Sequence, residues 1–173
     1  MRSTDFKTAA ALLFCLFFGS ACRAPVTDTL QPGGLTEREP AEAGKIFFNG
    51  HSDFYCKDPV LCKRLLTERF FRILKHEYDS CAVTGQMGAL DCDPWTNAQE
   101  GHVSEPFSFQ TIENKNSEAI VRFNYTFTLG PKSSLNQSVF LKFQRASLNE
   151  RWKLADFIMP NHESLVELLE RKP

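Results

Sequence analysis

The sequence has almost no net charge and contains none of the short motifs that mark common enzyme sites. It holds 20 Lys and Arg residues against 21 Asp and Glu residues, and residues 45–173 hold sixteen of each kind. Nucleic-acid-binding proteins gather basic residues on one surface, so this balance argues against nucleic acid as a partner. The HExxH pattern, the GxSxG elbow and glycine-rich phosphate loops are also missing. The sequence therefore predicts a protein that is not an enzyme.

The N-terminal apolar run is too short to stay in a membrane as a spanning helix. Residues 8–21 are mostly Ala, Leu and Phe, whereas a permanent span needs about 20 apolar residues. The run follows a weakly positive lead and ends in small residues, which predicts a signal peptide over residues 1–21. Gly19, Ser20 and Ala21, directly before Cys22, resemble a bacterial lipobox, although Leu or Val is usual at the Gly19 position.

The lipobox resemblance implies that the Cys22 thiol is acylated, with palmitate as one of the acyl chains, and becomes the mature N-terminus. The alternative is ordinary cleavage after Ala21, which leaves a soluble periplasmic or secreted protein. Arg23 carries a further implication by resemblance, because envelope lipoproteins with Asp at this position commonly stay in the inner membrane. We therefore expect a lipid anchor in the outer membrane, with the protein facing the periplasm.

The residues after Cys22 do not have the composition of a folded segment. Residues 23–44 hold three prolines, three glycines, several charges and few large apolar side chains. Such a segment cannot bury enough surface to offset the entropy lost on ordering. We expect a disordered tether over residues 22–44 and a single folded domain over residues 45–173, which is an ordinary size for one core.

Four cysteines remain in the expected domain, namely Cys56, Cys62, Cys81 and Cys92. Export places them in an oxidising compartment, where cysteines tend to pair. Three pairings are possible, and we favour Cys56 with Cys62 and Cys81 with Cys92 because each bridge closes a short loop. A zinc site is the alternative, but the stretch CKDPVLC has the wrong spacing for it. No metal or cofactor is expected.

Hydrophobic periodicity predicts an α+β domain. Asp58 and Pro59 are typical of a helix start, and apolar residues then recur every three or four positions, which predicts one long amphipathic helix ending near Asp79. Pro160 and Asn161 precede a short C-terminal helix. Alternating apolar and polar residues predict four strands, over residues 104–112, 119–129, 138–146 and 151–158. We expect both helices on one face of a curved antiparallel sheet with a cone-like shape.

The segments DCDPWTNAQE and RWKLADF, together with the Phe-rich strands, resemble a bacterial family of small exported proteins of unknown function, several of which are lipoproteins. The family's short motif is Asp93 and Pro94 followed by Gln99 and an acidic residue, usually Asp and here Glu100. The resemblance implies the cone-shaped fold of nuclear transport factor two and cystatin-like proteins. It implies no established activity.

The loop DCDPWTNAQE is the candidate binding loop. Asp91, Asp93, Gln99 and Glu100 offer oxygen ligands close together, so a divalent ion is one interpretation. The spacing of an EF-hand fails, because Trp95 stands where an oxygen donor is needed. We favour a structural role, in which the aspartates cap a turn and Trp95 inserts into the core as an anchor.

Tyr125 and Asp156 are the candidate cavity residues, because each falls within an apolar alternation. If both point inward, a buried carboxylate beside a phenol gains a raised pKa and can act as a base. In the alternative, the Tyr125 hydroxyl bonds the backbone and Asp156 lies at a strand edge or bulge.

The predicted function is a lipid-anchored accessory module that binds an envelope or exported protein, and an immunity or inhibitor role falls within this class. Small-ligand binding inside the cone is the alternative, followed by catalysis. A deep, partly polar cavity would favour a ligand or a reaction. An interior filled by phenylalanine, with an exposed apolar patch, would favour a protein partner.

Overall fold

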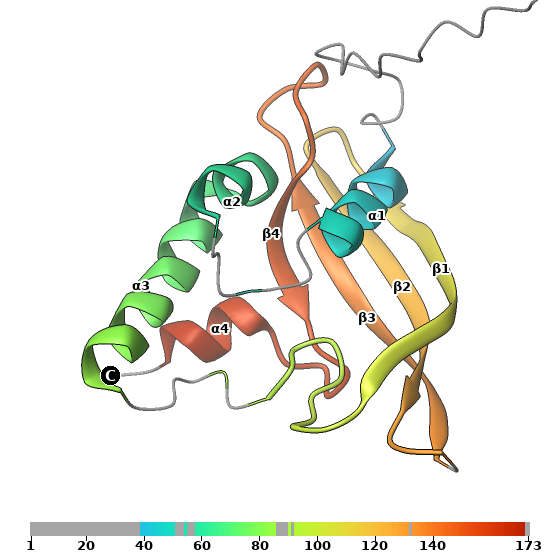
Figure 1. Ribbon diagram of the computed structural model, residues 1–173. Helices are drawn as coiled ribbons and strands as arrows, with labels where there is room; N and C mark the ends of the chain where they lie inside the picture. The colour runs from blue at the N-terminus through green and yellow to red at the C-terminus, as the bar shows by residue number, and fades with distance from the viewer. Residues whose placement is uncertain are drawn as a thin grey trace, which may run out of the picture. The chain divides into compact units, whose positions relative to one another are not determined.

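A computed structural model describes residues 39–50, 54, 58–85, 90, 92–131 and 133–171 of the chain. The helices are α1 (Pro40–Gly50), α2 (Pro59–Leu65), α3 (Glu68–Thr84) and α4 (Leu165–Glu170). The strands are β1 (His102–Asn114), β2 (Glu118–Thr128), β3 (Ser134–Gln144) and β4 (Lys153–Ile158). Figure 1 shows α1 lying across the strands, with α2, α3 and α4 beside β4.

The four strands form one antiparallel sheet in the order β1-β2-β3-β4, which confirms the predicted α+β class and the hairpin connections. Residues along β2 alternate between buried and half-buried, as the sequence pattern predicts. We call the side that carries Val121, Phe123 and Leu141 the inner face, because these side chains are fully buried. The opposite side, which carries Arg122 and Lys142, is the outer face.

The predicted long helix is wrong, because the chain leaves the helical path at Leu66 and Thr67. Leu66 is extended, fully buried and bridged to Leu154 of β4. The Thr67 amide donates to the Leu154 carbonyl at 2.9 Å, and the Thr67 hydroxyl caps α3. The break therefore satisfies backbone groups on the β4 edge that would otherwise lack partners. Hydrophobic periodicity does not reveal the break, because apolar residues keep the same spacing of three or four positions through α2, Leu66 and α3.

Helix α1 begins inside the predicted tether, which therefore extends too far at residues 40–44. Gly44 is buried and allows a close approach to the inner face. A Cβ atom at this position would lie 3.1 Å from Phe109 Cδ1 and 3.2 Å from Leu141 Cδ1. One helical turn further on, Phe47 is buried in the core. Tertiary packing of this kind stabilises short helices whose composition alone predicts none.

The predicted bridge between Cys81 and Cys92 is also wrong. Cys81 carries a free thiol on α3, and its sulfur donates to Glu77 Oε1 at 3.8 Å. The partner of the thiol is therefore a carboxylate of its own helix, four residues before it. Cys56 lies outside the described residues, so its bridge to Cys62 stays a prediction. Cys62 itself is fully buried on α2.

The expected signal peptide, the acylated Cys22 and most of the expected tether lie outside the described residues. Among the helices that the structure does describe, none is both long and apolar enough to span a membrane.

The close packing of Gly44 gives a first testable prediction. The change Gly44→Leu should lower the free energy of unfolding by about 1 to 3 kcal/mol, because the new side chain overfills the space against Phe109 and Leu141. The matched control is Lys45→Leu, at an exposed position of the same helix. Urea denaturation of both variants measures the difference. Equal stabilities for the two variants would contradict the packing of α1 on the sheet.

Candidate functional site

Residues 92–98 form a tight turn that is held together by Asp93. The Asp93 amide donates to the Ala98 carbonyl at 3.0 Å, and the Asp93 carbonyl accepts from Asn97 N at 2.7 Å. The Asp93 carboxylate accepts from Trp95 N at 3.0 Å and from Thr96 Oγ1 at 3.3 Å. Asn97 adopts a left-handed backbone with φ of 50°, which asparagine tolerates well. The carboxylate is therefore used inside the turn.

Within the described part of the candidate loop, Gln99 and Glu100 make no hydrogen bond to Asp93. Asp91 lies outside the described residues. Gln99 and Glu100 follow the turn with exposed side chains. Across the part of the chain that the structure describes, no three His, Cys, Asp or Glu side chains lie close enough to hold a metal ion. The geometry of the described loop residues supports the role of the loop as an anchor for Trp95.

Trp95 inserts from this turn into the aromatic interior and is only 3% exposed. Its neighbours come from α1, β2, β4 and residue 54. Their ring centroids lie between 4.8 and 5.9 Å from the indole, and they are Phe47, Phe48, Phe54, Phe123 and Phe157. Several pairs are edge-to-face, the arrangement that aromatic quadrupoles favour. We call these six residues the aromatic cluster. It occupies the space between α1 and the inner face.

Tyr125 extends the same interior with a polar end. Its ring lies 5.2 Å from that of Phe123 and is buried on the inner face. Its hydroxyl donates to the Trp95 carbonyl and also lies 3.2 Å from Gln137 Oε1. Burial raises the pKa of Tyr125, and the negative charge of Asp93 raises it further. The phenol therefore stays neutral, and its hydrogen bond links β2 to the turn.

Asp156 does not join Tyr125, so the two residues form no common site. The Asp156 carboxylate accepts from Phe157 N at 2.8 Å, from Ser164 Oγ at 2.9 Å and from Val166 N at 3.3 Å. Ser164 in turn caps α4. A register shift in the β3–β4 pairing lies beside it. Asp156 therefore fastens β4 to the start of α4, which agrees with the structural alternative for this residue.

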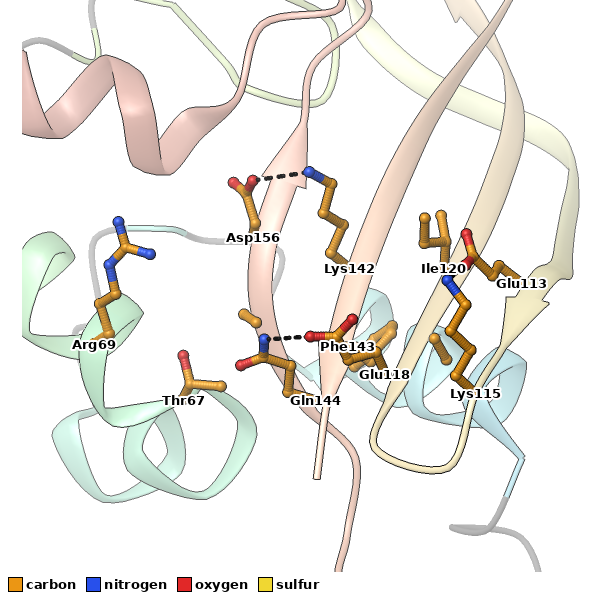
Figure 2. A pocket seen from close by; sticks show the side chains of 12 residues that line it. Thr67, Arg69, Glu113, Lys115, Glu118, Ile120, Lys142, Phe143, Gln144 and Asp156 are labelled. Atoms are coloured by element: carbon orange, nitrogen blue, oxygen red, sulfur yellow. Dashed lines mark hydrogen bonds and ion pairs between the residues drawn. The ribbon is translucent and has the colours of Figure 1, made fainter. Parts of the chain in front are cut away.

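A groove of about 520 Å³ crosses the outer face beside β4, where Figure 2 shows its lining. Thr67 and Arg69 border it on the helix side, and the strand residues lie on the other side. Those from the strands and their connections include Glu113, Lys115, Glu118, Ile120, Lys142, Gln144 and Asp156. We call it the outer groove. The sequence alone does not predict this groove, and its only signal there is the row of polar residues in the strand alternation.

The charges of the outer groove are already paired. Lys142 Nζ lies 3.5 Å from Asp156 Oδ2, and Gln144 Nε2 donates to Glu118 Oε1 at 3.2 Å. Glu113 pairs with Lys115 in the same way. Exposed pairs of this kind contribute at most about 1 kcal/mol each. A ligand could therefore displace them at little cost, but the groove offers no excess charge of either sign.

The chain matches no family model, no curated protein and no solved structure. The resemblance to exported bacterial proteins with a cone-shaped fold therefore stays a prediction. Support for a function therefore comes from the positions and contacts of the described residues.

The environment of Asp93 predicts a pH-dependent stability. Partial burial raises the pKa of Asp93 above 3.8 and outweighs the bonds from Trp95 and Thr96, which lower it. The folded state therefore binds a proton more tightly than the unfolded chain. This contribution favours folding at low pH and is lost as pH rises from 3.8 through the raised pKa. Asp93→Asn keeps an oxygen acceptor for Trp95 N and removes the charge.

We expect Asp93→Asn to be at least as stable as the parent at pH 7, with the parent gaining relative to it as the pH falls. Asp93→Ala, the control, should lose about 1 to 2 kcal/mol at every pH because Trp95 N and the Thr96 hydroxyl lose their acceptor. Thermal unfolding from pH 3 to pH 8 measures both effects. If Asp93→Asn were as unstable as Asp93→Ala at pH 7, the carboxylate would have a role beyond that of an acceptor.

Proposed function

We propose that this chain is a lipid-anchored envelope protein whose domain binds a protein partner and carries out no reaction. Cys22 would hold the acyl chains in the outer membrane, and the residues after it would place the domain in the periplasm. An immunity or inhibitor role against an exported toxin belongs to the same class of function. The family resemblance is consistent with this proposal.

One observation carries the proposal, namely that the aromatic cluster occupies the interior where a cone-shaped protein would hold a small ligand. Phe123 and Phe157 reach this space from the sheet, and Phe47 and Trp95 reach it from α1 and the turn. All four are at most 3% exposed. The two residues considered for catalysis are engaged in structural hydrogen bonds. The surface is therefore the better place to look for binding.

Next to the aromatic cluster, one aromatic side chain is exposed at β1, an edge strand of the sheet. Phe107 on β1 is 39% exposed, and its ring lies 5.1 Å from Phe48 and 5.7 Å from Phe123. On the same strand, Ile112 is 48% exposed. Strand β1 lies at the end of the strand order, so only one of its sides pairs within the sheet. We call the exposed part of Phe107 the aromatic surface at β1, and we infer that it is a contact point for a partner because it lies on an edge strand.

A photocrosslinking side chain at Phe107, introduced into the full chain in intact cells, tests the proposal. We expect it to capture one defined protein, because Phe107 lies on the exposed aromatic surface. The matched control is the same probe at Leu148, which is exposed in the β3–β4 connection. Mass spectrometry identifies the captured protein. No adduct at Phe107, or the same adducts at both positions, would count against a specific protein partner.

The same cells test the anchor through Cys22→Ser. If Cys22 is acylated, the parent sediments with membranes and the variant moves to the soluble fraction. Equal partitioning of the two proteins would rule out the anchor and leave the binding role to be judged by the Phe107 adduct alone.

A further inference from the structure

A second groove, of about 460 Å³, lies between α3 and α4 and is distinct from the aromatic surface at β1. Ile73 on α3 and Leu169 on α4 give it apolar walls, and Leu169 is buried against the core. Arg69 closes the end next to the outer groove through its contacts with Glu170, at 2.7 Å from Nη2 to Oε2 and 3.1 Å from Nε to Oε1. We call this the helix groove.

The helix groove contains two hydrogen-bond donor side chains that the fold does not use. Arg72 and His76 both line it, are both exposed and stand one helical turn apart on α3. Within the described residues, neither side chain makes an ion pair or a hydrogen bond. The neighbouring cation Lys75 differs, because its Nζ pairs with Asp79 Oδ2 at 2.6 Å.

The two acidic side chains of the helix groove have contacts with residues other than Arg72 and His76. Glu170 accepts from Arg69, as described above. Glu77 is buried, and its Oε1 accepts from the Cys81 sulfur at 3.8 Å. The groove therefore offers two donors, Arg72 and His76, beside an apolar wall. The complementary ligand is a carboxylate with an apolar group next to it.

We propose that the helix groove binds an acidic segment of the protein partner, with a carboxylate on Arg72 and His76 and an apolar side chain against Ile73 and Leu169. This inference rests on the proposed function in that the ligand belongs to a protein. The planar guanidinium matches a carboxylate in two parallel hydrogen bonds. A lipid headgroup presents a phosphate without an apolar side chain next to it, whereas a protein segment presents a carboxylate and an apolar side chain together. A protein segment therefore fits better than anionic lipid.

Binding of a defined peptide to the full chain tests the inference. The probe is a synthetic peptide that alternates leucine and glutamate, and its partner peptide carries glutamine in place of glutamate. Amide chemical shifts of the isotope-labelled protein, followed during titration, report both the affinity and the place of binding. We expect the acidic peptide to shift signals of α3 and α4, and the glutamine peptide to have no such effect.

Two variants separate the helix groove from general electrostatic attraction. Arg72→Ala should weaken binding of the acidic peptide about tenfold, because the carboxylate loses its charge-assisted contact with the exposed guanidinium. Lys75→Ala removes an equal charge from α3, three residues after Arg72, and should leave the affinity for the acidic peptide unchanged. Equal losses in both variants, or shifts scattered over the whole surface, would overturn the inference.

Phosphatidylglycerol vesicles form the remaining arm of the experiment. If they bind the full chain through Arg72 while the acidic peptide does not, the groove serves anionic lipid and the inference is wrong. The proposed function has its own separate outcome. A Phe107 adduct with a partner, combined with no peptide binding in the helix groove, would leave the protein-binding role intact and remove only this inference.

Discussion

The insertion of Trp95 into the space between α1 and the inner face of the sheet is the constraint on which the rest of the structure depends. The indole joins parts of the chain that are far apart in sequence, since its aromatic neighbours come from α1, β2 and β4. Aromatic side chains bury large areas and pair in preferred geometries, so one such residue can hold several elements together. The turn that presents Trp95 is held by the Asp93 carboxylate, which accepts from Trp95 N and from the Thr96 hydroxyl.

Because aromatic side chains fill the interior, the candidate binding sites lie on the surface. The Tyr125 hydroxyl donates to the Trp95 carbonyl, and the Asp156 carboxylate accepts from Ser164 Oγ at the start of α4. Both polar groups therefore stabilise the fold, each in a different place. What remains open are the aromatic surface at β1, the outer groove with its paired charges and the helix groove with its two unpaired donors. These open surfaces are the basis of the proposed role in binding another protein.

The sequence predicted most of the sheet, because a period of two is a direct consequence of strand geometry. Asp58 and Pro59 likewise predicted the start of α2, since a cap and a first-turn proline act locally. The sequence could not predict the break between α2 and α3 at Leu66, because Leu66 pairs with Leu154, which is far away along the chain. Helix α1 was missed for a related reason, since Gly44 has value in a helix only where another element approaches it closely. The turn role of Asp93 was predicted from local chemistry, whereas both grooves arise from tertiary placement.

Binding of indole to the parent protein and to Trp95→Ala tests the central claim most directly. The Trp95→Ala variant, which should lose about 3 to 5 kcal/mol of stability, leaves an apolar void that indole can fill. If the aromatic cluster fills the interior, indole stabilises the variant in a saturable way and leaves the parent unchanged. Saturable binding of indole to the parent, with shifted signals from Phe123 and Phe157, would show an open interior cavity and contradict the account.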